Sequence, residues 1–181
     1  LVASEVDMAI VAAKSSNPLI ASSPIGTVGF GWYGAAASVG RAGCVEQALL
    51  DRLHLVSLPV GSGITRLVDD WLRGQGLVVR HRITCNHWMA VAGLLEGGLG
   101  IGVLPEGWAR DIGASRALRR LACAPDLPGL AYFVQWRSDD YRGLVTRLAK
   151  VAREMAVFDR LCIGRHEKDR TVHAGGVSRE S

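Results

Sequence analysis

Two short polar segments of this sequence each join a predicted strand to a predicted helix. The first, Gly61-Ser62-Gly63, lies between a predicted strand at 53–58 and a predicted helix at 64–73. The first turn of a helix has backbone N–H groups without intrahelical acceptors and carries the positive end of the helix dipole. Together with the Ser62 hydroxyl, these N–H groups can bind a small anion or polar ligand. The same hydroxyl can equally cap its own helix, and one serine can do both.

The second segment, Cys85-Asn86-His87-Trp88, follows a predicted strand at 77–84 and opens a predicted helix at 87–96. Asn86 is expected to be the N-cap of this helix, because asparagine is among the preferred residues there. The carboxyl ends of parallel strands lie at one edge of a sheet, so both segments are predicted to face the same crevice. We therefore expect Ser62 and residues 86–88 to lie around one ligand-binding site.

The sequence lacks the spacings that common catalytic and cofactor sites need. It contains no G-x-S-x-G or H-E-x-x-H motif. Asp69-Asp70 and Asp139-Asp140 are adjacent pairs whose side chains point in different directions on a helix, so neither forms an acid–base dyad. The glycine clusters lack the spacing, the lysine or the following helix of a nucleotide-binding loop. The four cysteines form no CxxC pair, and His87 has no second histidine or carboxylate beside it. We predict a protein that is not an enzyme and has no metal ion or cofactor.

Strand-like and helix-like segments alternate along most of the chain, which predicts an α/β fold with a largely parallel sheet. The predicted strands are 6–11, 28–33, 53–58, 77–84, 100–104, 118–122 and 130–136. The predicted helices are 64–73, 87–96, 106–112 and 139–158. The last of these has the clearest apolar stripe at i, i+3, i+4 spacing. Residues 161–181 are polar and without periodicity, which is typical of a disordered tail.

Composition is that of a globular domain without a nucleic-acid or membrane signature. The 181 residues include 49% hydrophobic and 21% charged residues, enough for one domain or two small lobes. Lys and Arg number 21 against 17 Asp and Glu, and this small excess forms no basic stripe. No apolar run approaches the roughly 18 residues that span a bilayer. The unpaired cysteines favour a reducing, cytoplasmic location.

One stretch resembles a known family. The predicted helix at 87–96 ends at Gly97-Gly98, a short apolar strand follows at 101–104, and Pro105 opens another helix. This V-A-G-L-L-E-G-G-L-G-I-G-V-L-P arrangement resembles the effector-binding domain of LysR-type transcriptional regulators, and the resemblance covers roughly residues 6–158. It implies an α/β, type 2 periplasmic-binding-protein-like fold of two lobes with mostly parallel sheets.

The resemblance also implies a layout. Residues 1–29 and 136–160 would form part of lobe I, which would be incomplete, and residues 30–135 would form lobe II. The chain would cross between lobes near 29–32 and near 130–136. A winged helix-turn-helix, a linker helix and the first strands of the sensor would precede residue 1, so we expect the C-terminal part of a longer protein. One departure is that residues 33–38 replace the family's usual His-Pro-Leu element.

By resemblance, the effector pocket lies between the lobes. It would use Asn86, His87 and Trp88 beside Ser62 and Gly63, with Val103, Leu104 and Pro105 lining a wall. The implied partners are a small-molecule effector, such as a small carboxylate or aromatic acid, and further copies of the chain. DNA would bind only through the preceding winged helix-turn-helix. Two alternatives share the fold: a solute-binding protein of a transport system, and a cleft enzyme.

Overall fold

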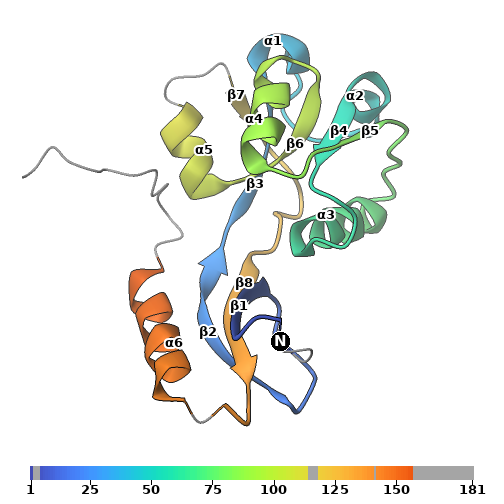
Figure 1. Ribbon diagram of the computed structural model, residues 1–181. Helices are drawn as coiled ribbons and strands as arrows, with labels where there is room; N and C mark the ends of the chain where they lie inside the picture. Colours follow the sequence, from blue (N-terminus) through green and yellow to red (C-terminus); the bar gives the residue numbers. More distant parts are fainter. Residues whose placement is uncertain (2–4, 114–117, 141, 157–181) are drawn as a thin grey trace, which may run out of the picture.

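Two separate β-sheets organise the molecule (Figure 1). The computed structural model describes residues 1, 5–113, 118–140 and 142–156; the expected disordered tail at 161–181 lies outside this part. The smaller sheet has three strands in the order β1 (Met8–Ala12), β8 (Leu130–Arg137) and β2 (Ile20–Val28), and both of its ladders are antiparallel. The larger sheet has five strands in the order β5-β4-β6-β3-β7. The expectation of an α/β fold with more than one sheet is confirmed.

The larger sheet mixes parallel and antiparallel pairing. Its strands are β3 (Phe30–Ala35), β4 (His54–Ser57), β5 (Arg82–Thr84), β6 (Gly100–Pro105) and β7 (Leu118–Leu121). β4 pairs in parallel with β5 and with β6, whereas β3 pairs antiparallel with β6 and β7. The expectation of mostly parallel sheets is therefore wrong in this detail. Only the strands joined by crossover helices are parallel, because a helix returns the chain to the starting end of the sheet.

Two helices cover opposite faces of the larger sheet. The helices of the chain are α1 (Ala36–Val39), α2 (Gln47–Arg52), α3 (Gly63–Gly74), α4 (Trp88–Glu96), α5 (Glu106–Gly113) and α6 (Gly143–Met155). On β4, Leu55 packs in the core cluster of α3, and the next residue, Val56, packs in the cluster of α4. Successive strand residues point to opposite faces, so each face of the sheet has its own hydrophobic core.

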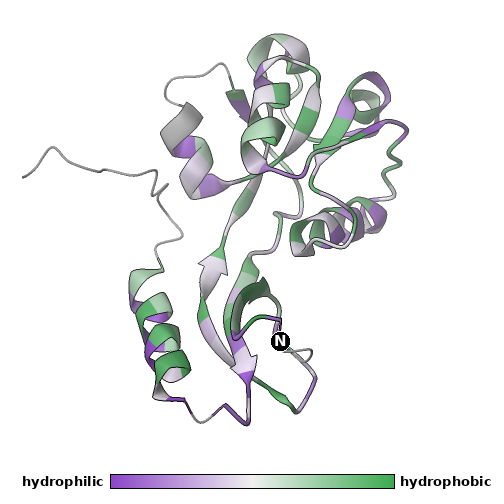
Figure 2. Ribbon diagram, in the orientation of Figure 1, coloured by the Kyte–Doolittle hydropathy of each residue, from purple (hydrophilic) through white to green (hydrophobic). Residues whose placement is uncertain are grey.

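The smaller sheet packs against α6. Ile25, Val134 and Ala149 form its buried cluster. A stripe of α6 next to this buried face leaves large apolar side chains in solvent, and Figure 2 shows hydrophobic positions along much of this helix. These exposed residues are Leu144, Leu148, Val151 and Met155. The helix begins at Gly143 instead of residue 139, because Asp139 and Asp140 pair with Arg137 and Arg142 in the preceding turn.

The chain passes twice between the sheets, and both passages contain a glycine. Gly29 divides β2 from β3, where one continuous strand at 28–33 was predicted, and Gly129 precedes β8. Val28 and Leu130 are cross-strand partners, so the two passages lie side by side, as β2 and β8 do in Figure 1. A Cβ atom on Gly129 would lie only 2.6 Å from Thr27 Cγ2. The passages therefore pack too closely to accept a side chain at this point.

The structure contains elements that the sequence did not predict, and it shortens one that it did. The unpredicted elements are β2, α1 and α2. Of the predicted strand at 77–84, only β5 is a strand in the structure. The first residues of the prediction form hydrogen bonds outside any sheet: Leu77 N–H donates to the Leu72 carbonyl, and Val78 N–H donates to Gln47 Oε1.

Candidate functional site

Ser62 caps the start of α3, which is one of the two roles expected for it, the other being contact with a ligand. Thr65 N–H donates to Ser62 Oγ at 3.2 Å, and Ser62 Oγ donates to Thr65 Oγ1 at 2.8 Å. Thr65 Oγ1 in turn donates to the Leu58 carbonyl at 2.9 Å. The Ser62 hydroxyl hydrogen is thus committed within the protein. Gly63 and Ile64, the first two residues of the helix, keep N–H groups without an intrahelical acceptor.

The start of α4 is capped by His87 and not by Asn86. His87 has extended backbone angles (φ −147°, ψ 136°), and its Nδ1 accepts a hydrogen bond from Met89 N–H at 3.1 Å. Because Nδ1 is the acceptor, the ring hydrogen lies on Nε2. Asn86 precedes the cap with an exposed side chain. The second segment therefore presents an exposed amide and an imidazole donor.

Both segments leave the same edge of the larger sheet. Ser57 and Thr84, the last residues of β4 and β5, are partners in the parallel ladder. The ladder extends one step further, because Cys85 N–H donates to the Ser57 carbonyl at 2.9 Å. The carboxyl ends of the two strands therefore bring Ser62 and residues 86–88 to one edge. That a ligand binds there stays a prediction.

This edge meets the smaller sheet at Gly63. A Cβ atom on Gly63 would lie 2.7 Å from Ala12 Cβ and 3.3 Å from Leu130 Cδ2. The first turn of α3 thus packs directly against the end of β1 and the start of β8. Tyr132, paired with Ala12, lies beside this contact, and burial raises the pKa of its hydroxyl, which is therefore neutral at neutral pH. The candidate site is located where the two sheets come together.

The aromatic ring of Trp88 lies partly in solvent. It stacks on Phe30 with ring centroids 6.1 Å apart and an interplanar angle of 26°, and it packs against both core clusters of the larger sheet. Phe30 pairs with Pro105, whose side chain is partly exposed. Val103 and Leu104, expected to line the same wall, are core residues with 5% and 0% exposure. Their side chains lie in the cores on opposite faces of the larger sheet, and Pro105 is the member of the trio that is partly exposed.

Arg82 adds a positive charge near this edge that the sequence analysis did not single out. Its guanidinium forms an ion pair with Asp69 of α3, and its Nη1 lies 3.4 Å from Ser57 Oγ. The Arg82 side chain is 25% exposed, and Ser57 is 6% exposed. A basic residue near the carboxyl end of a predicted strand, beside an acidic residue on the preceding helix, is the signal that could have identified it.

A metal site with three or more protein ligands and a membrane-spanning helix are both absent from the described ranges. There, the side chains of His, Cys, Asp and Glu form no group of three or more that could hold a metal ion. Across the same residues, every helix is too short or too polar to cross a lipid bilayer. What this edge offers is hydrogen-bond donors, positive potential and an aromatic face.

Comparisons with known proteins were made for sequence and for structure. The family model described as the LysR substrate binding domain matches residues 1–155. No curated protein matches the sequence. The regulatory domain of MetR, a LysR family regulator from N. meningitidis, has a TM-score of 0.71 and 16% identity, covering 85% of this chain and 74% of that one. The CcmR regulatory domain of Synechocystis PCC6803 in complex with 2-PG has a TM-score of 0.69 and 18% identity, covering 83% and 73%. The effector binding domain of QuiR in complex with shikimate has a TM-score of 0.68 and 15% identity, covering 84% and 72%.

Proposed function

Because this chain belongs to the LysR substrate-binding domain family and so has the effector-sensing role of a transcription regulator, we propose that its effector binds where the larger sheet meets the smaller one. The observation that carries this proposal is the contact of Gly63 with Ala12 and Leu130. It brings one strand-to-helix segment against the other sheet, and the β4–β5 ladder brings the second segment to the same edge. A ligand at this edge can touch both sheets at once.

The site consists of Ser62, Gly63, Asn86, His87, Trp88 and Pro105, with Val103 and Leu104 in the cores of the larger sheet. The smaller sheet with α6 corresponds to lobe I, and the larger sheet with its helices corresponds to lobe II. We propose the expected division into 1–29, 30–135 and 136–160, of which residues 2–4, 114–117, 141 and 157–160 lie outside the described part, with one adjustment. Residues 130–135 belong with lobe I, because β8 pairs with β1 and β2 from Leu130 onward.

The chemistry of the site favours a small carboxylate or aromatic acid. Two helix N-termini and the Nε2–H of His87 can donate hydrogen bonds to an anion. Arg82 adds positive charge, although Asp69 competes for it. The exposed part of Trp88 offers a face for an apolar or ring-shaped body. A comparable ligand class occurs in QuiR, which was solved with shikimate, a carboxylic acid.

Signalling in this proposal is a shift between two arrangements of the lobes and needs no bond chemistry. A ligand changes such an equilibrium only through its different affinities for the two states. We propose that the chain is a cytoplasmic, non-enzymatic sensor that forms homo-oligomers, and that DNA binds to a separate winged helix-turn-helix. The family match favours this reading over a transport protein, which shares the fold.

The test combines thermal melting with tryptophan fluorescence on the chain, using shikimate and a panel of small aromatic and aliphatic carboxylates. A binding acid at a hundredfold excess over its Kd should stabilise the fold by about 2.7 kcal/mol and change the emission of Trp88. Trp88→Ala should abolish both responses, whereas Trp136→Phe, in the smaller sheet, should keep them. The uncharged methyl ester of the same acid should bind weakly.

The stability of the unliganded variants separates a binding role from a packing role. Complete loss of a large buried aromatic costs about 3–5 kcal/mol, and such a collapse in Trp88→Ala would mean that the ring is mainly structural. Trp88→Phe retains the contact with Phe30 and resolves this case. If Trp88→Phe is stable and binds the acid as wild type does, an aromatic face at this position is sufficient for binding; if a stably folded Trp88→Ala also binds as wild type does, the ring does not recognise the effector.

A further inference from the structure

Two histidines far apart in the sequence lie side by side at the other end of the larger sheet. His54 is the first residue of β4, and His81 immediately precedes β5. Leu55 N–H donates to the His81 carbonyl at 2.9 Å, which extends the parallel ladder back to this pair. The ring centroids are 5.6 Å apart with planes inclined at 54°, and both side chains are exposed. This is the amino end of the strands, opposite the proposed effector site.

A backbone contact selects which nitrogen of His54 is available. His54 Nδ1 lies 3.2 Å from the Leu99 carbonyl oxygen. A carbonyl can only accept, so Nδ1 carries the hydrogen and Nε2 has the free lone pair. A histidine that binds a metal through one nitrogen commonly donates the other N–H to a backbone carbonyl or carboxylate, which fixes the tautomer and the ring orientation. His54 already has this arrangement.

We propose that His54 and His81 form a two-histidine site for a divalent first-row transition-metal ion. A metal–nitrogen bond of about 2.0–2.1 Å places each ring centre about 3.2 Å from the ion, so two rings at a tetrahedral angle have centres about 5.2 Å apart. The observed centroid distance of 5.6 Å is close to this value, so the two rings are near enough to share one ion. No third side chain joins them within the described ranges, so water completes the coordination. Imidazole ligands suit Zn²⁺, Ni²⁺ and Cu²⁺ over Mg²⁺ and Ca²⁺.

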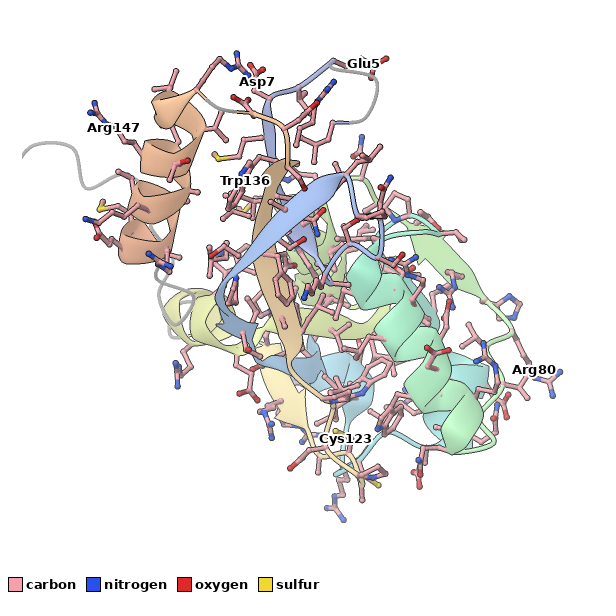
Figure 3. The ribbon with its side chains drawn as sticks, turned by 90° about the horizontal axis from the view of Figure 1, so that it is seen from below. Glu5, Asp7, Arg80, Cys123, Trp136 and Arg147 are labelled. Carbon is pink, nitrogen blue, oxygen red and sulfur yellow. The ribbon has the colours of Figure 1, made fainter. Side chains whose placement is uncertain are left out.

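The charges around the pair permit a cation. Arg80 and Arg82 flank His81 in the sequence, but each is paired: Arg80 Nε lies 2.8 Å from Asp51 Oδ1, and Arg82 contacts Asp69. Figure 3 shows Arg80 at the outer rim of the molecule, far from Asp7 and Trp136 in the smaller sheet. The neighbouring positive charges are therefore partly neutralised, and water has free access.

A bound ion would fasten the edge strand β5 to its neighbour β4. β5 has only three residues and one neighbouring strand, β4. A link from His54 to His81 closes a loop that contains α3, and such a link stabilises a fold by restricting the unfolded chain. Because β5 leads directly to residues 86–88, the ion would also fix the strand that carries half of the proposed effector site.

Isothermal titration of the chain with NiCl₂ tests the proposal. One Ni²⁺ should bind, and His54→Gln or His81→Gln should each weaken its binding at least tenfold. Ni²⁺ should raise the melting temperature of the wild type and leave both variants unchanged, whereas Mg²⁺ should affect none of them. Because both side chains are exposed, we expect the metal-free variants to melt close to the wild type.

The remaining histidines supply the controls. His87→Asn keeps an N-cap at α4, and a double variant His166→Gln/His173→Gln removes the last two histidines of the chain. Both should bind Ni²⁺ as the wild type does. The site is refuted if His54→Gln and His81→Gln, folded by circular dichroism, retain wild-type affinity, or if the double variant alone loses binding.

Discussion

At the scale of single residues, the cap of α4 depends on one ring nitrogen. His87 Nδ1 is the acceptor for Met89 N–H, a donor in the first turn that has no intrahelical partner. Replacing His87 by alanine removes this acceptor and should lower the free energy of unfolding by about 1 kcal/mol. His87→Asn supplies an amide oxygen at the same place and should remain within a few tenths of wild type. Urea denaturation distinguishes the two variants, and equal losses in both would show that the cap contributes nothing.

The acid response of the protein depends in part on Asp140. Hydrogen bonds from the Arg142 side chain and backbone lower the pKa of Asp140 from 3.8 to about 2. Arg142 also reaches Asp7 at 2.5 Å, which ties the start of α6 to the N-terminal segment. A carboxyl with a depressed pKa stabilises the fold above its unfolded pKa and loses this contribution as the pH falls. Stability should therefore decrease between about pH 4 and pH 2.

Urea midpoints measured across that pH range test the role of this pair. Asp140→Asn should flatten the pH dependence in this window, and Arg142→Gln should flatten it to a similar degree. Both changes remove the Asp140–Arg142 ion pair, and Arg142→Gln also removes the contact with Asp7, so the double variant should add little to Arg142→Gln. Additive effects would mean that the two side chains stabilise the fold independently.

The role of a residue could be predicted from the sequence where it depends only on neighbouring residues in the chain, as a helix cap does. Ser62 caps α3 as its residue type indicates. Asn86 was the better candidate for the second cap by residue type, but the backbone turns into the helix one residue later, and His87 fills the position. Histidine is a rare cap, so composition alone favours the wrong neighbour. Arg82 was missed because its significance depends on Ser57 and Asp69, which only the folded chain brings beside it.

At the scale of elements, the two ends of α3 give opposite expectations for the same substitution. Gly63 and Gly74 are its first and last residues. Gly63→Ala would bring two rigid Cβ atoms to 2.7 Å, so α3 or β1 must move, and we expect a loss of about 1–3 kcal/mol. Gly74 has open space around it, and Gly74→Ala should stabilise the protein by about 0.4–1 kcal/mol. Chemical denaturation of both variants provides the measurement.

A neutral result for Gly63→Ala would show that the first turn of α3 moves freely against β1. In that case the contact on which the proposed effector site rests is not a tight one. Gly74→Ala controls for the general effect of replacing glycine in this helix, because the two variants differ only in their surroundings.

Elements with a strong apolar period were predicted, and elements without one were not. Helices α3, α4 and α5 lie within a residue or two of their predicted bounds. β2 was missed because Ser22, Ser23 and Pro24 give it no alternation of apolar and polar residues. Its existence depends on β8, more than a hundred residues later, which supplies its hydrogen-bond partners. The sequence pattern of residues 20–28 alone therefore cannot show that a distant strand pairs with them.

At the scale of the whole molecule, alternation of strands and helices predicted the α/β class but not the pairing. The parallel ladders arise where α3 and α4 return the chain to the starting end of the sheet. No single crossover helix joins β3 to β6 or to β7, its neighbours in the sheet. β3 pairs antiparallel with both of these strands. The two-lobed arrangement was expected only from the resemblance of residues 85–105, because residue periodicity contains no information on which strands share a sheet.

The two passages between the sheets also make the five-stranded sheet and its helices a segment that can be removed or transferred as a whole. Val28 and Leu130, which stand at its entry and exit, are directly opposed partners of one antiparallel ladder, and such partners have Cα atoms about 4.5–5.5 Å apart. A segment whose ends lie this close can be cut out and replaced by a tight hairpin turn, or grafted into a surface hairpin of another protein. The five-stranded unit is thus a cassette inserted into the smaller sheet. Any unit put in its place would have to match the host at the same contact, because Gly63 lies against Ala12 and Leu130.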